Sequence, residues 1–101
     1  MTTLTREIAR KLFEEKGPEV VIPEAYTSIG LNAFSKLKIT SVKIPASIKT
    51  IGTNAFAYNK LSSVVIPKGV THIGWGAFIG NQLSSAIISE SVTAIGKYAF
   101  N

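Results

Sequence analysis

Cysteine is absent from this chain of 101 residues, which excludes disulfide bonds and any metal site with thiolate ligands. Long apolar runs are missing as well, so no segment is predicted to cross a membrane. The first residues, Met1 to Glu7, lack the apolar core of a secretory signal. We therefore expect the chain as written to be cytoplasmic, unless a leader has been removed from it.

Side chains suited to catalysis are scarce. His72 is the only histidine, and the acidic residues, all glutamates, have no spacing typical of a carboxylate pair or a metal cluster. The segment Gly74 to Gly76 lacks the third glycine and the strand–helix context of a dinucleotide-binding loop. The sequence therefore predicts no catalytic residue, no cofactor and no metal, and we do not expect an enzyme.

Acidic residues are missing between Glu24 and Glu90, and the formal net charge is +5. Six lysines lie in that interval: Lys36, Lys38, Lys43, Lys49, Lys60 and Lys68. They can keep the protein in solution, or they can bind an anionic surface such as nucleic acid or a cell-wall polymer. Arginine, the usual bidentate reader of phosphates and bases, is absent after the first residues, so we expect no sequence-specific binding of nucleic acid.

A repeat of 22 residues organises most of the chain. Ile-Gly pairs, Ala-Phe pairs and prolines each recur at this interval; the isoleucines of the Ile-Gly pairs are Ile29, Ile51, Ile73 and Ile95. A fixed period of this length is typical of a solenoid, in which each repeat packs only against its neighbours. We divide the array into repeats 17–38, 39–60, 61–82 and 83–101.

The third repeat shows the expected structure of one unit. Ser63 to Ile66 alternates apolar and outward residues and predicts a short strand, which Pro67 ends. Val70 to Ile73 is a second extended piece, and Trp75 to Ile79 is predicted to form one helical or 3₁₀ turn that carries the Ala-Phe pair into the core. Asn81 supports the bend back. The four first strands are expected to run parallel, about 4.8 Å apart.

The N-terminal segment differs from the repeats. Leu4, Ile8 and Leu12 form one apolar stripe and predict an amphipathic helix, with Thr5 as its N-cap and Gly17 after its end. Such a helix can bind a membrane or a partner. Because a solenoid needs its open end covered, we expect residues 1–17 to form a capping helix on repeats that occupy 18–101.

The pattern L-x-S-V-x-I-P-x-x-V-T-x-I-G-x-x-A-F in Leu61 to Phe78 resembles the BspA-like class of bacterial leucine-rich repeats. The ends Asn59-Lys60-Leu61 and Asn81-Gln82-Leu83 fit its 22-residue variety, and the resemblance covers 18–101. It implies a right-handed leucine-rich-repeat solenoid, a β/α superhelix that is mostly strand and loop, with a short parallel sheet on its concave side. It also implies roles in adhesion and protein–protein contact, often at the cell surface.

Candidate contact residues lie where the repeats differ. The outward slots of the first strands form one row: Val21, Lys43, Val65 and Ile87. Three aliphatic side chains in that row are either the footprint of a partner or too few to form a patch. Trp75 and Tyr58 replace non-aromatic residues in their slots, and they either anchor a partner or pack over the turns. We expect a non-catalytic module for protein–protein interaction or self-assembly.

The last repeat has no predicted cover on its far side. Its inward side chains are then exposed: Ala86, Ile88, Val92, Ile95 and Phe100. Two explanations are open. The chain is part of a longer array, or two chains meet through these ends as a homodimer, which a two-fold contact would close.

Overall fold

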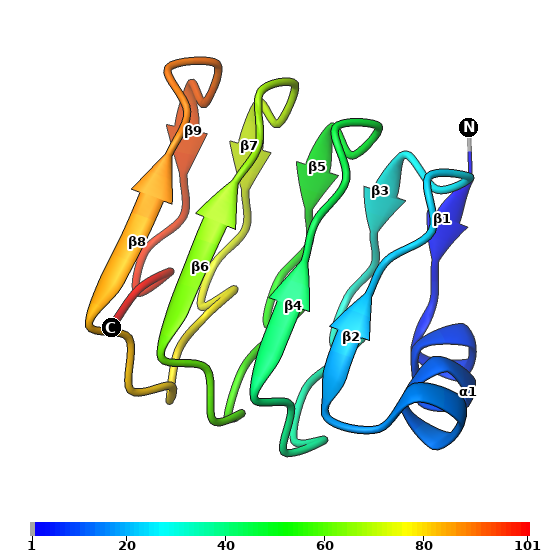
Figure 1. The fold of residues 1–101 in the computed structure, drawn as a ribbon. Helices are drawn as coiled ribbons and strands as arrows, with labels where there is room; N and C mark the ends of the chain where they lie inside the picture. The colour runs from blue at the N-terminus through cyan, green and yellow to red at the C-terminus, as the bar shows by residue number, and fades with distance from the viewer. Residues whose placement is uncertain (1) are drawn as a thin grey trace.

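The structure is a computed structural model that describes residues 2–101, in which the chain winds in successive repeats into a flattened coil (Figure 1). The helix is α1, Arg6–Lys16. The strands are β1 (Thr3–Leu4), β2 (Glu19–Val21), β3 (Ser28–Ile29), β4 (Ser41–Lys43), β5 (Thr50–Ile51), β6 (Ser63–Ile66), β7 (His72–Ile73), β8 (Ser85–Ile88) and β9 (Ala94–Ile95). Parallel strands and loops thus dominate, as the sequence predicts. Met1, the first residue of the predicted segment 1–17, lies outside the described residues.

One wall of the coil is a continuous five-stranded parallel sheet in the order β1-β3-β5-β7-β9. Its register pairs Ser28 with Thr50 and Thr50 with His72, so each repeat lies directly beside the next. The Gly74 N–H continues the ladder by donating to the carbonyl of Ile51 at 2.8 Å. The sequence predicted the second extended piece of each repeat, but not that these short pieces form the sheet with the most strands.

Glycine after β3, β5, β7 and β9 lets the repeats approach closely. A Cβ on Gly74 would lie 2.7 Å from the backbone carbon of Gly52 and 2.7 Å from the backbone nitrogen of Thr53. Such contacts are far shorter than van der Waals distance, so no other residue fits there without displacing the repeats. The recurring Ile-Gly pair is therefore a packing requirement of the coil.

The second wall contains the strands predicted from the sequence, and β6 spans the predicted residues Ser63–Ile66. The expected parallel direction is confirmed in both strand pairs, but the expected constant spacing of four strands was wrong, because β2 pairs only with β4 and β6 only with β8. Strands β4 and β6 lie side by side without a ladder between them (Figure 1). Val42 of β4 is accordingly half-buried, whereas Val20 and Val64 are buried.

The third side consists of turns. The helical or 3₁₀ turn predicted at Trp75 to Ile79 is not formed, although this segment buries Ala77 and Phe78 as predicted. Two successive turns occupy this segment, closed by hydrogen bonds from Ala77 N–H to the Gly74 carbonyl at 3.2 Å and from Ile79 N–H to the Gly76 carbonyl at 3.1 Å. Gly76 has φ 59°, in the left-handed region. A left-handed residue interrupts the helical φ and ψ values, so the turns cannot propagate into a helix.

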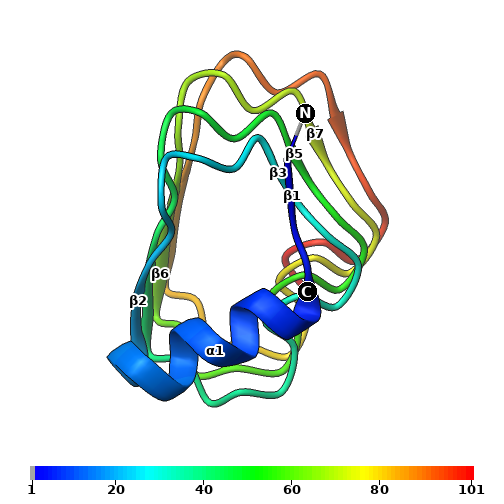
Figure 2. The same cartoon turned by 90° about the vertical axis from the view of Figure 1, so that its right-hand side faces the viewer.

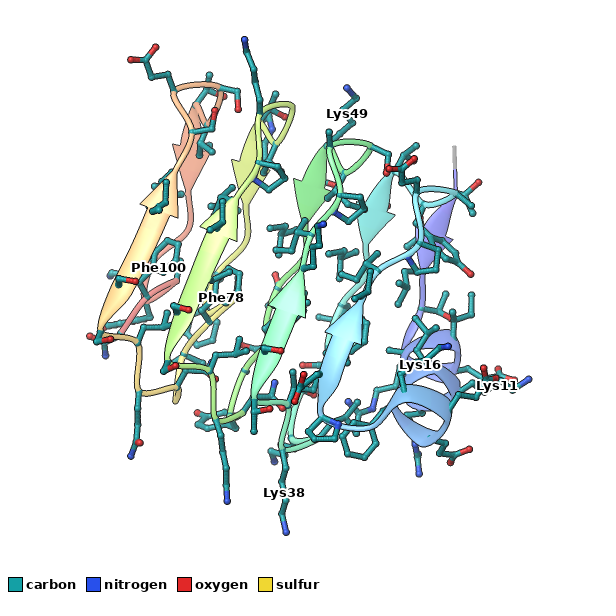
Figure 3. The ribbon with its side chains drawn as sticks, in the orientation of Figure 1. Lys11, Lys16, Lys38, Lys49, Phe78 and Phe100 are labelled. Carbon is teal, nitrogen blue, oxygen red and sulfur yellow. The ribbon has the colours of Figure 1, made fainter. Side chains whose placement is uncertain are left out.

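The core holds a stack of phenylalanine rings from the Ala-Phe pairs. The Phe34 and Phe56 rings lie 5.2 Å apart, Phe56 and Phe78 5.1 Å, and Phe78 and Phe100 5.3 Å, all nearly parallel. Figure 3 shows Phe78 and Phe100 at matching places in successive repeats. These separations suit offset stacking, and each ring buries its neighbour, which no single repeat could do.

Asparagine side chains satisfy backbone groups inside the bend. The buried Asn59 amide accepts hydrogen bonds from the N–H groups of Leu37 and Ile39 at 3.1 and 3.0 Å. It donates to the carbonyls of Phe34 and Phe56 at 2.8 and 2.9 Å. Asn81 makes three of the four corresponding contacts one repeat later, so the predicted role of this asparagine in the bend is confirmed.

Helix α1 lies across the first repeat (Figure 2). The Thr5 hydroxyl accepts a hydrogen bond from the Ile8 N–H at 3.4 Å, and the Gly17 N–H donates to the Phe13 carbonyl at 2.7 Å, which confirms both predicted ends. The prediction that Leu4 belongs to the helix was wrong. Leu4 belongs to β1, and its carbonyl accepts a hydrogen bond from the Gly30 N–H of the next repeat. Its side chain is fully buried.

Candidate interaction surface

An exposed aliphatic row lies on the wall formed by β2, β4, β6 and β8. The period of two residues along a strand turns Val20 and Val64 inward and their neighbours outward. As a result Val21, Val65 and Ile87 are 62%, 56% and 63% exposed. The register pairs Val21 with Lys43 and Val65 with Ile87, and Lys43 and Val65 line one hollow between the two pairs of strands. We call Val21, Lys43, Val65 and Ile87 the wall row; the structure brings all four together, as the sequence predicts.

Two hollows of about 360 Å³ each open on this wall. The first lies between β2 and β4 and is lined by Val21, Ile22, Pro23, Glu24, Lys43, Ile44, Pro45 and Ala46. The second lies at the interruption between β4 and β6 and is lined by Ser41, Val42, Lys43, Ile44, Ser63, Val64 and Val65. Lys43 and Ile44 border both hollows, so the lysine stands between two largely apolar depressions.

The two aromatic candidates lie apart from the wall row, on turns after β5 and β7. Tyr58 is 53% exposed, and the Lys36 ammonium lies 5.8 Å from the centre of its ring. Trp75 is 45% exposed and meets the ring of Tyr98 edge-on at 5.7 Å. Both rings thus have neighbours within the chain and still present much of their surface to solvent, so they form no single surface with the wall row.

Sequence reasoning missed some exposed side chains and some lining residues. Leu31 is 65% exposed and Tyr98 49% exposed, both in slots that vary from repeat to repeat. Pro23 and Pro45 were interpreted only as strand ends, yet they line the first hollow. The exposure of Leu31 and Tyr98 could have been predicted, because their positions vary from repeat to repeat. The hollow could not, because it depends on the spacing of neighbouring strands, which the sequence period does not reveal.

The five predicted self-association residues gather in the repeat 83–101. Ile88 and Ile95 are 39% and 50% exposed, whereas the corresponding Ile66 and Ile73 are 1% and 2% exposed. The other three are less uniform: Ala86 is exposed, and Val92 and Phe100 are half-buried. The inward positions of this repeat therefore present apolar surface.

The lysines are spread around the coil. All six lysines between Glu24 and Glu90 are exposed. Lys38 and Lys49 project in opposite directions (Figure 3), whereas Lys43 lies in the wall row. The positive charge is therefore distributed over several sides of the protein.

His72 is exposed, and its Nδ1 lies 2.8 Å from the hydroxyl of Thr71 on the neighbouring residue. Across residues 2–101, no group of three histidine, cysteine, aspartate or glutamate side chains could hold a metal ion. The only helix in the same described part of the chain, α1, is too short and too polar to span a membrane.

The repeat geometry agrees with a comparison against protein families. The model of the BspA type leucine-rich repeat region matches residues 2–101, in six copies. The chain belongs to the BspA-type leucine-rich repeat family. The resemblance noted in the repeats is thereby confirmed, and the BspA-type match also includes β1 and α1, which sequence analysis placed outside the repeats. Comparisons with curated proteins and with solved structures returned no match.

Proposed function

We propose that this BspA-type repeat array is a non-catalytic protein-interaction module and that the wall row is its contact surface. The observation that carries this proposal is the alignment of three largely exposed aliphatic side chains, Val21, Val65 and Ile87, on one wall. Aliphatic side chains gathered on one face favour docking, because burying them against a partner removes apolar surface from water. Right-handed winding and a concave curvature of this wall belong to the same proposal.

A site-specific crosslinker tests this proposal in the cells that contain the protein. We expect a photoreactive residue at Val65 to crosslink to a discrete protein and the same residue at Leu31 to give no such product. Leu31 is a matched control because it is an equally exposed aliphatic residue away from the wall. Products that are equal from both positions would contradict the proposed surface.

Point variants then test how much each side chain contributes to the affinity for the partner. Val65→Asp places a carboxylate in the centre of the row, and we expect it to weaken the complex by about tenfold or more. Leu31→Asp changes the same formal charge elsewhere and serves as the control. Trp75→Ala tests whether the aromatic turns take part: a loss comparable to that of Val65→Asp would extend the contact to that side, and Tyr58→Ala would be examined in the same way.

Salt dependence separates this function from binding of an anionic surface. An apolar contact loses little affinity between 50 and 200 mM salt, whereas neutralising several phosphates makes affinity fall steeply over that range. A steep loss that is unaffected by Val65→Asp would favour the repeat lysines, among them Lys38, Lys49 and Lys60, and an anionic polymer. The distribution of these lysines over several sides supports the first function.

We propose self-association as a second role, through the repeat 83–101. The exposure of Ile88 and Ile95 supports it, since a second copy of the chain would cover them. Sedimentation of the wild type and of Ile95→Asp at high micromolar concentration tests the idea. We expect a homodimer that Ile95→Asp dissociates, and a wild-type chain that remains a monomer would exclude it.

A further inference from the structure

We propose that Lys43 makes the wall row selective for an amphipathic helix of a partner protein that presents a carboxylate between aliphatic side chains. This inference rests on the proposed function, because it names the chemistry of the partner that the same surface would accept. It follows from the charge of Lys43, from the hollows beside it and from the spacing of the repeats.

Lys43 is the only charged residue of the wall row, since the corresponding residues are Val21, Val65 and Ile87. Throughout residues 2–101, the structure shows no ion pair to the Lys43 ammonium, and acidic residues are missing between Glu24 and Glu90. A purely apolar partner that covered the row would strip water from this ammonium and leave it unpaired, which is costly. A partner that supplies a carboxylate at that point avoids the cost and gains a charge-assisted hydrogen bond.

The hollows define what lies on either side of the carboxylate. Both are bordered by Lys43, and their other linings are mostly apolar, with Val21 beside the first and Val65 beside the second. The partner is therefore expected to place one aliphatic side chain on each side of its acidic residue. Glu24, which lines the first hollow, further disfavours a second carboxylate on that side.

The spacing of the repeats favours a helix over an extended strand. Strands joined by a ladder lie about 4.8 Å apart, which is the spacing of Val21 from Lys43 and of Val65 from Ile87, whereas β4 and β6 have no ladder between them. One helical turn rises about 5.4 Å, close to the spacing of one ladder. In a helix that runs along the coil, residues i and i+7 are about 10.5 Å apart and residue i+4 lies between them. An extended chain presents side chains on one face every 6.8 Å or so, which does not match one repeat. The expected partner helix therefore carries an aliphatic residue at i to contact Val21 and another at i+7 to contact Val65. Its acidic residue at i+4 faces Lys43, and residue i+11 lies near Ile87.

Titrations with three synthetic helical peptides test the proposal. Each is an alanine-based peptide of about 20 residues with leucine at i, i+7 and i+11, and it carries glutamate, glutamine or lysine at i+4. Binding to the isotope-labelled full chain is followed by NMR. We expect the glutamate peptide to shift the amides of Val21, Lys43 and Val65 and to bind at least about tenfold more tightly than the lysine peptide.

A charge reversal gives the decisive comparison. Lys43→Glu is expected to invert the order, so that the lysine peptide binds most tightly, and Lys43→Gln is expected to abolish the difference. Lys49→Glu makes the same change of net charge on another side of the coil and should leave the order as it is in the wild type. Inversion by Lys43→Glu alone would support the proposal.

Each contrary result has its own meaning. Equal binding of the glutamate and lysine peptides that Val65→Asp still abolishes would overturn the acidic selectivity and leave the interaction module standing. If Lys49→Glu also inverted the order of affinity of the glutamate and lysine peptides, the peptides would be responding to the net charge of the protein and not to Lys43. Peptide-induced shifts confined to the repeat 83–101, or no shift at millimolar peptide, would overturn the inference, and crosslinking from Val65 would still report on the module itself.

Discussion

The amide oxygen of Asn59 accepts a hydrogen bond from the backbone N–H of Ile39 at 3.0 Å, so one repeat completes the bend of the repeat before it. Replacement by leucine, which occupies the corresponding slot at position 37, would leave buried N–H and carbonyl groups without partners. We expect Asn59→Leu to lower the free energy of unfolding by about 3 kcal/mol, measured by urea denaturation. Gln82→Leu, an exposed polar-to-leucine change, should shift it by less than about 0.5 kcal/mol.

The close approach at Gly74 leads to a second prediction. A Cβ there would lie 2.7 Å from the backbone of the preceding repeat, so Gly74→Ala must push two repeats apart. We expect a loss of about 3 kcal/mol in the free energy of unfolding. Gly30→Ala is the graded control: its nearest backbone atom, the carbonyl oxygen of Leu4, is 3.1 Å away, and the expected loss is about 1 kcal/mol. Equal losses would show that contact with the preceding repeat is not the cause.

The phenylalanine stack predicts a gradient of stability along the coil. Phe56 is fully buried between two rings, and we expect Phe56→Ala to cost about 4 kcal/mol through lost burial and a cavity. Phe100 is half-buried and stacks on Phe78 alone, so Phe100→Ala should cost about 2 kcal/mol. Thermal unfolding of both variants checks the order, and the reverse order would contradict the stack.

Arg6 ties α1 to the first repeat. Its guanidinium donates from Nη1 to the carbonyls of Asn32 and Ser35 at 2.9 and 2.6 Å. In later repeats the carbonyl at the position of Ser35 accepts a neighbouring backbone N–H, as Ala57 does from Lys36. We expect Arg6→Ala to cost about 2 kcal/mol and to raise amide hydrogen exchange in β1 and β3 before that of β7. The variant Arg10→Ala, an exposed arginine on the same helix, should leave that exchange unchanged.

The sequence predicted the inward side of the fold well, because identical positions such as Ile51 and Ile73 must meet when the repeats stack. It also predicted the N-cap at Thr5 and strand β6. It did not predict that Leu4 joins a strand, because its spacing from Ile8 also fits a helical stripe. The helical or 3₁₀ turn predicted at Trp75 to Ile79 was wrong. An Ala-Phe pair is compatible with a helix, but the left-handed φ of Gly76 prevents one from forming there.

The candidate surface was only partly predictable. Alternation along the strands placed Val21, Lys43 and Val65 in one row without a structure. The hollow between β4 and β6 depends on how far these strands stand apart, and that distance is set by packing that differs from repeat to repeat. The 22-residue period of the sequence cannot predict a difference in strand spacing, because the period describes only the features that all repeats share.

The missing ladder between β4 and β6 has a mechanical consequence. At that level only the opposite sheet, the core and the turns hold the two halves of the coil together, so the wall is most compliant there. Bending of the protein should concentrate along this line and act as a hinge that widens or narrows the hollow beside Lys43. A partner seated in that hollow would then stiffen the coil, and force spectroscopy along its axis would detect the change as a higher rupture force.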